Sequence, residues 1–115
     1  AFRNSVNMRC IIPAEGFYEW KWLDEKGKQK QKYFIKLKDC EILSFAGLYS
    51  RWLNKTTGEI LDTFTILTTA ANELMSEIHN TKKRMPVVLN YEDEINWLNG
   101  KINNFIDVEL VAENK

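Results

Sequence analysis

The sequence of 115 residues has few of the residues that build metal centres or disulfide frameworks. It contains one histidine and two cysteines, Cys10 and Cys40, with no Cys-x-x-Cys motif, so we expect no metal site and two buried, reduced thiols. No run of about 18 apolar residues occurs, which excludes a membrane-spanning helix. No signal-peptide pattern is visible at the start. The formal net charge is zero, which argues against a generally basic nucleic-acid-binding protein.

What the chain does contain is typical of one folded domain. Hydrophobic residues make up 44% and aromatic residues 12% of the sequence, enough for a buried core. The charges are unevenly placed, because lysines concentrate between residues 21 and 38, a basic run occupies 82–84, and carboxylates are common near the C-terminus. A local basic face is therefore compatible with zero net charge. Because the chain begins with Ala1 and not with methionine, we expect it to be part of a longer protein.

Alternating apolar segments predict an α+β fold that is mainly antiparallel, with a barrel-like curved sheet and about two or more flanking helices. The segment 60–68 carries apolar residues on both faces, which predicts a central strand covered on both sides. Segment 105–111 is expected to form an edge strand or to lie on the surface. The other predicted strands are 9–14, 17–22, 33–37, 42–49 and 86–89, with polar turns at 24–30, 38–39 and 54–58.

Two segments carry helix signals. Thr69 is the predicted N-cap of a helix over 70–78, and His79 follows this helix, where the macrodipole favours an imidazolium. Asn90 is the predicted N-cap of a second helix over 91–98, with acidic residues in its first turn and Gly100 just past its end.

Glu19 and His79 are ionisable residues in places that a structural core would not favour. Glu19 lies in the aromatic run Phe-Tyr-Glu-Trp, on the strand face opposite the larger aromatic set. It is either a solvent-facing carboxylate paired with a lysine such as Lys21 or Lys36, or a general base in an aromatic-walled cleft. His79 is either a helix cap or the second member of an acid/base pair. If the two act together, their side chains should line one cleft.

The remaining candidates for a site are basic and aromatic. Lys82, Lys83 and Arg84 form either a solvated loop or a phosphate-binding patch next to His79. The tryptophans are expected in the core, although one or two exposed rings could stack on nucleic-acid bases: Trp20, Trp22, Trp52 and Trp97. A Glu/His pair also needs a nucleophile or an activated water, and Cys10, in an apolar strand, carries no sign of activation.

Two separated motifs resemble those of one family in the same order. Residues 9–20, Arg-Cys-Ile-Ile-Pro-Ala-Glu-Gly-Phe-Tyr-Glu-Trp, form the first, and the second runs from Thr-Thr-Ala-Ala-Asn at 68–72 through Ile-His at 78–79 to Arg-Met-Pro-Val-Val-Leu at 84–89. Over about residues 1–100 the chain resembles the SRAP family, the SOS response-associated peptidase-like proteins. The resemblance implies an SRAP-like fold over residues 1–115, incomplete at both the N-terminus and the C-terminus.

The resemblance also implies a reaction. Proteins of this family recognise abasic sites in single-stranded DNA, and a cysteine that follows the initiator methionine forms a thiazolidine crosslink with the open-chain sugar aldehyde. Autoproteolysis exposes that cysteine, so the family combines peptidase-like and lyase-like chemistry. By this resemblance Glu19 and His79 are the acid/base residues, while Thr68 and Arg84 bind DNA together with Lys82 and Lys83.

The chain departs from the family pattern in ways that limit the expectation. It lacks the Met-Cys start and the Asn-Ala-Arg-like segment, and Lys82 and Lys83 lengthen the stretch between His79 and Arg84. Cys10 and Cys40 do not match the nucleophile's position, so this chain alone should not crosslink DNA. The alternatives are a cysteine-type peptidase that acts on peptides and a non-catalytic single-stranded DNA-binding module. We further expect no cofactor, no membrane partner, a monomer, and a cytoplasmic location, nucleoid-associated if the source is bacterial.

Overall fold

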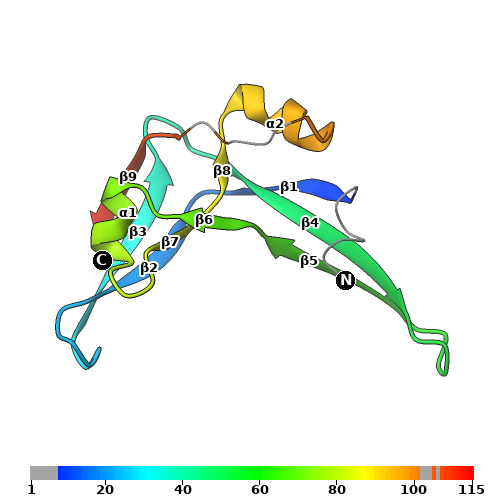
Figure 1. The fold of residues 1–115 in the computed structure, drawn as a ribbon, viewed down its shortest axis with the longest axis horizontal. Coiled ribbons are helices and arrows are strands. Elements are labelled where there is room, and N and C mark those ends of the chain that lie inside the picture. Colours follow the sequence, from blue (N-terminus) through cyan, green and yellow to red (C-terminus); the bar gives the residue numbers. More distant parts are fainter. Residues whose placement is uncertain (1–7, 102–104, 106) are drawn as a thin grey trace.

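The computed structural model describes residues 8–101, 105 and 107–115, and all structural statements below refer to these residues. Its strands and helices are arranged as an arch with a long hairpin at one end and α1 at the other (Figure 1). Along the chain the elements are β1 (Arg9–Ala14), β2 (Phe17–Trp22), β3 (Lys30–Leu37), β4 (Leu43–Leu53), β5 (Ile60–Ile66), β6 (Thr68–Ala70), α1 (Glu73–Ile78), β7 (Arg84–Pro86), β8 (Val88–Leu89), α2 (Tyr91–Leu98) and β9 (Leu110–Asn114).

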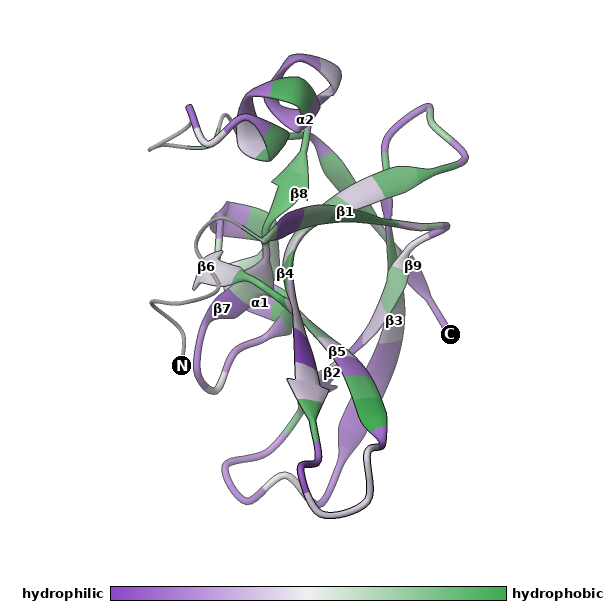
Figure 2. Ribbon diagram, turned by 90° about the vertical axis from the view of Figure 1, so that its right-hand side faces the viewer, coloured by the Kyte–Doolittle hydropathy of each residue, from purple (hydrophilic) through white to green (hydrophobic). Residues whose placement is uncertain are grey.

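The strands form three antiparallel sheets. In the first, β4 pairs with β1 on one side and β5 on the other, and the short β8 also pairs with β4. The second has the order β2-β3-β9, and the third is the small β6-β7 pair. The predicted α+β, mainly antiparallel class is confirmed. The sheets curve strongly (Figure 2), although among the described residues none closes into a barrel.

The core lies between the sheets and under α1. Ile35 of β3, Leu43 of β4 and Met75 of α1 are fully buried in one cluster. A second cluster gathers around Trp97 of α2, whose Nε1 donates a hydrogen bond to the carbonyl oxygen of Cys10 at 2.9 Å. Strand β8 contributes Val88 to the first cluster and Leu89 to the second. Figure 2 shows the hydrophobic colour of β8 and the polar colour of much of β2 and β3. Apolar residues of β1, β3, β4, β8 and β9 therefore supply most of the strand contribution to this core.

The tryptophans only partly follow the expectation of a core position. Trp97 is buried and Trp22 is half-buried, but 48% of Trp20 and 55% of Trp52 are exposed. Trp20 lies on the outer face of β2 and Trp52 near the tip of the β4-β5 hairpin. Trp20 alternates with half-buried neighbours on β2, and Trp52 lies where β4 extends beyond the core. The residue type alone does not indicate which tryptophans are buried.

The prediction that segment 60–68 is a covered central strand is wrong. Strand β5 ends at Ile66, lies at the edge of the order β1-β4-β5, and is exposed along nearly all its length. Leu61 and Phe64, on opposite faces, are 48% and 64% exposed. Apolar residues on both faces are typical of a strand buried on two sides, but no second layer of the described residues covers this hairpin.

The start of the first helix also differs from the prediction. Thr69 lies in β6, which pairs with β7, so the helix cannot begin there. Instead Asn72 is the N-cap of α1, and its Oδ1 accepts a hydrogen bond from the Met75 N–H at 2.9 Å. The second helix, Tyr91–Leu98 with Asn90 as N-cap, begins and ends as predicted. Both residues satisfy amide donors that the first helical turn leaves without a partner.

Replacing Asn72 with alanine should lower the free energy of unfolding by about 1 kcal/mol, because it removes the capping acceptor. The Asn72 amide also donates to Asp107 Oδ1 at 3.3 Å, so the loss should not fall below that value. Thr69→Ala is the matched control, since Thr69 is exposed and outside the helix. Urea unfolding followed by tryptophan fluorescence measures both variants, and equal losses in the two would contradict Asn72 as the cap.

Three smaller predictions need correction. The expected strand 86–89 is divided, because Arg84–Pro86 pairs with β6 whereas Val88–Leu89 pairs with β4. The last strand is Leu110–Asn114, at the edge beside β3; part of the predicted segment 105–111 lies outside the described residues. Both cysteines are free thiols, but Cys10 is only partly buried and Cys40 is exposed, since it follows the turn after β3.

Candidate functional site

Glu19 lies on β2, an edge strand of the order β2-β3-β9. Side-chain exposure alternates along β2, with Glu19 half-buried between the exposed Tyr18 and Trp20. This confirms that Glu19 lies on the face opposite these two rings. Its carboxylate turns back to the strand, where Oε1 accepts a hydrogen bond from the Trp20 N–H at 3.1 Å. Lys36, one of the lysines considered as its partner, instead forms an ion pair with Glu113 at 2.9 Å.

His79 is the C-cap of α1, as the sequence predicted. Its backbone N–H donates to the Met75 carbonyl at 2.7 Å, and its ring is half-buried. Ring atom Nδ1 lies 3.0 Å from the Arg84 nitrogen and 2.9 Å from the Arg84 carbonyl oxygen. An unprotonated Nδ1 accepts from the Arg84 N–H, whereas a protonated Nδ1 donates to the Arg84 carbonyl. The ring therefore keeps a hydrogen-bonding partner at Nδ1 in either state.

Residues 79–84, which we call the histidine turn, connect α1 to β7. The Lys83 N–H donates to the His79 carbonyl at 2.9 Å, and the Lys83 carbonyl accepts from the Ala71 N–H at 3.0 Å. Lys83 has a φ of 53°, a left-handed conformation that is uncommon for a residue with a side chain. Backbone hydrogen bonds thus fix the turn, while the side chains of Lys82 and Lys83 are exposed.

Arg84 and Thr68 come together on the neighbouring pair of strands. The Arg84 Nη2 donates to Thr68 Oγ1 at 3.0 Å, and the backbones of β6 and β7 pair in antiparallel register. Both residues are exposed. The guanidinium retains further donors that can bind a phosphate oxygen. The structure therefore places the basic side chains on the surface next to His79.

A side chain that the sequence analysis missed joins the histidine turn to β2. Asn80 Oδ1 accepts from the Trp22 N–H at 3.1 Å, and Asn80 Nδ2 donates to the Trp22 carbonyl oxygen at 2.8 Å. The two partners are 58 positions apart in the sequence. Asparagine after a helix usually indicates only a cap or a turn, so no local signal could have identified this contact.

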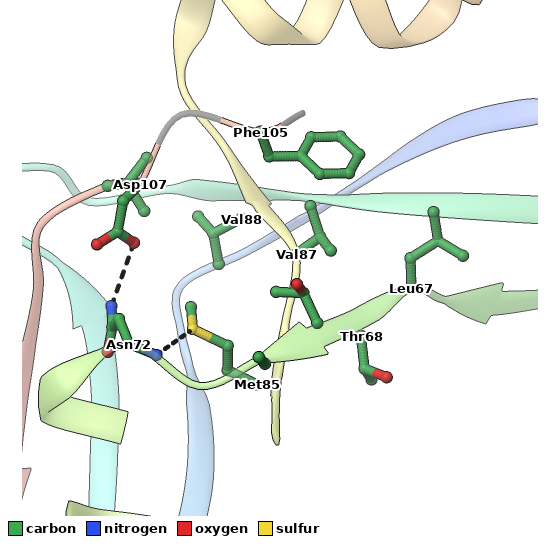
Figure 3. Close-up of a pocket in the computed structure, with 11 residues that line it drawn as sticks. Leu67, Thr68, Asn72, Met85, Val87, Val88, Phe105 and Asp107 are labelled. Carbon is green, nitrogen blue, oxygen red and sulfur yellow. Dashed lines mark hydrogen bonds between the residues drawn. The ribbon is translucent and has the colours of Figure 1, made fainter. Parts of the chain in front are cut away.

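A pocket of about 480 Å³ lies beside β6, β7 and the segment before β9. Figure 3 shows Asn72 at its border, bonded to Asp107 through its side chain and to the Met85 sulfur through its backbone nitrogen. Its lining includes Thr68 but neither Glu19 nor His79. That Glu19 and His79 line one cleft therefore stays a prediction. Their hydrogen bonds go to different partners, Trp20 and Arg84.

Cys10 differs from an activated nucleophile. Burial raises the pKa of the Cys10 thiol, which favours the protonated form. A nucleophilic cysteine has the opposite shift, towards the thiolate. Within residues 8–101, 105 and 107–115, no group of three or more histidine, cysteine or acidic side chains is placed to hold a metal ion. In the same residues no helix is long and apolar enough to cross a membrane.

The sequence that carries the two motifs matches the model of a known family. The family model described as SOS response associated peptidase (SRAP) matches residues 1–114. The chain belongs to the SRAP family. The family predicted from the motifs around Glu19 and His79 is thereby confirmed.

Curated relatives and solved structures agree with this membership. The abasic site processing protein YoqW of Bacillus subtilis is 53% identical over 96 residues, covering 84% of this chain and 40% of YoqW. The abasic site processing protein HMCES of Gallus gallus is 34% identical over 109 residues, covering 78% of this chain and 31% of HMCES. A crystal structure of a Bacteroides thetaiotaomicron protein is similar with a TM-score of 0.85 and 40% identity, over 98% of this chain and 52% of that one.

The SRAP chain thus spans less than two thirds of each of these three proteins, 40% of YoqW, 31% of HMCES and 52% of the Bacteroides protein. The fold seen in Figure 1 corresponds to that part of the family. Both motif segments, with Glu19 in the first and His79 in the second, lie inside the matched region.

Proposed function

We propose that this SRAP protein, in its complete form, processes abasic sites in single-stranded DNA. The observation that supports this most is the arrangement at β2, where a half-buried carboxylate and a histidine-bearing turn both reach the same strand. The names of the relatives YoqW and HMCES, both abasic site processing proteins, support the same function. Thr68, Lys82, Lys83 and Arg84 would hold the DNA phosphates beside this pair.

The proposed reaction joins an N-terminal cysteine to the ring-opened sugar. The α-amine adds to the aldehyde carbon and the adduct loses water to give an imine. The thiol then adds to the imine carbon, and its proton passes to nitrogen, so one water is released overall. Glu19 would carry protons during ring opening and imine formation, and His79 would do so through Nε2 while Nδ1 stays bonded to Arg84. Autoproteolytic exposure of the cysteine would use the same two groups.

The test is a covalent adduct that survives denaturation. Intact-mass spectrometry first establishes the N-terminal residue of the purified gene product. The protein is then incubated with single-stranded DNA that carries one abasic site, and a urea gel is expected to show a shifted band. DNA with an ordinary base at that position is the control and should give none. A protein with a free N-terminal cysteine that forms no adduct would overturn the proposal.

One observation favours a different function, a non-catalytic module that binds single-stranded DNA. Tyr18 and Trp20 are 56% and 48% exposed on the outer face of β2, and Lys32 Nζ lies 4.4 Å and 5.8 Å from their ring centroids. Exposed rings beside a cation can stack on bases without reading sequence. This function predicts a complex with DNA of either kind that disappears in urea, so the same gel distinguishes the two.

A further inference from the structure

We propose that Asn80 is a positioning residue that sets the spacing between the His79 ring and the Glu19 carboxylate. This inference rests on the proposed acid/base roles of these two residues. Asn80 directly follows His79, and its amide holds both backbone polar groups of Trp22, which lies three residues after Glu19 on β2. No other side chain of the histidine turn has a hydrogen bond to β2 among those of the described residues.

The geometry of an edge strand places Glu19 and Asn80 on the same side of β2. Strand β2 pairs with β3 on one side only, and the backbone groups of successive residues point to opposite edges, so those of residues two apart point to the same edge. Because the Trp22 groups point to Asn80, those of Trp20 point to the same free edge. Glu19 Oε1 accepts from the Trp20 N–H, so its carboxylate bends over that edge. The two contacts are two residues apart, about 7 Å along a strand.

Asn80 acts here as a substitute for a neighbouring strand. An amide side chain offers one acceptor and a donor, which match the N–H and C=O of one backbone residue. The other hydrogen bonds of the histidine turn run within the turn, to α1, to β6 and to Ala71 just after β6, so the turn can form without Asn80. Asn80 therefore fixes the distance between the histidine turn and β2. Proton transfer between groups that serve one substrate is sensitive to errors in that distance.

Two variants and a control separate positioning from general stability. Asn80→Ala removes both hydrogen bonds, whereas Asn80→Asp keeps the acceptor for the Trp22 N–H and loses the donor to the Trp22 carbonyl. Asn54→Ala is the matched control, because the Asn54 side chain also makes two hydrogen bonds to the backbone, accepting from the Thr56 and Thr57 N–H groups, but in the remote β4-β5 loop. All three should cost comparable stability, and only the Asn80 variants should change the site.

The first readout needs no activity. His79 is the only histidine, so its ring signals in an NMR spectrum are assigned without ambiguity. Glu19→Gln should shift the His79 ring signals in the wild-type background and should shift them clearly less in Asn80→Ala, a double-mutant cycle between neighbouring groups. Hydrogen exchange of the Trp22 amide should be fast in Asn80→Ala, intermediate in Asn80→Asp, and unchanged in Asn54→Ala. Equal shifts in both backgrounds would overturn the proposal.

The second readout is the adduct of the full gene product. At saturating abasic-site DNA, Asn80→Ala should slow adduct formation by about 10- to 100-fold, with Asn80→Asp between it and the wild type. The apparent Kd for DNA should stay within about twofold, since Asn80 is proposed to bind no phosphate. An unchanged rate with a lost Trp22 contact would overturn the positioning role. If the wild type forms no adduct, the proposed function fails, and the NMR cycle decides on Asn80 independently.

Discussion

Glu19→Gln is expected to slow formation of the abasic-site adduct by about 100- to 10,000-fold, the usual contribution of a positioned acid/base group. Glutamine has nearly the same shape and can still accept the hydrogen bond from the Trp20 N–H, so the local structure should persist. What it cannot do is take up or release a proton near neutral pH. Adduct formation is measured as a single-turnover rate on a urea gel.

The control for this prediction is Glu15→Gln, which makes the same charge change four residues earlier. Glu15 is exposed in the bend between β1 and β2 and is not a candidate for the site. Its adduct rate should stay within about twofold of the wild type, because single surface charges have small effects. Equal rates for wild type and Glu19→Gln would mean that Glu19 is not the acid/base residue.

Gly16→Ala is expected to lower the free energy of unfolding by about 3 kcal/mol or more, through overpacking. Gly16 lies between β1 and β2, and a Cβ added there would meet the Ile35 carbonyl oxygen at 2.3 Å and the Phe34 ring at 2.6 Å. Because Ile35 is fully buried in β3, its backbone cannot move without disturbing the core. The variant should therefore displace β2 and the Glu19 it carries.

Urea unfolding followed by tryptophan fluorescence measures this loss against Gly58→Ala. A Cβ at Gly58 would meet nothing within 4 Å, although its φ of +77° disfavours alanine. The control should lose about 1–2 kcal/mol, from backbone conformation alone. If Gly16→Ala loses no more unfolding free energy than Gly58→Ala, the close approach of Gly16 to β3 is wrong.

Local patterns succeeded where a local interaction decides the structure. Alternation along 17–22 predicted a strand with Glu19 opposite Tyr18 and Trp20, and the burial along β2 agrees. The second helix was predicted because Asn90 caps it through a contact only three residues away. Membership of the SRAP family was also visible, because its two motifs are short and their order is specific.

The same patterns failed where pairing with a residue far away in the sequence decides the secondary structure or the burial. Thr69 and Asn72 are both acceptable N-caps, and the choice fell on Asn72 because Thr69 pairs with Met85 in the β6-β7 ladder. Segment 60–66 has the apolar faces of a covered strand, but its position at the sheet edge depends on which strands pair with β4. A sequence pattern records which faces could be buried and not what lies over them.

The sequence by itself determined the strands β1 and β2, the second helix, the family and the identity of Glu19 and His79 as candidates. Each of these depends on periodicity, on caps a few residues apart, or on contiguous motifs. Only the tertiary structure decided that the carboxylate of Glu19 and the histidine turn share one edge of β2, through the contact of Asn80 with Trp22. A hydrogen bond between residues 58 positions apart forms only when the chain folds, so no local sequence pattern predicts it.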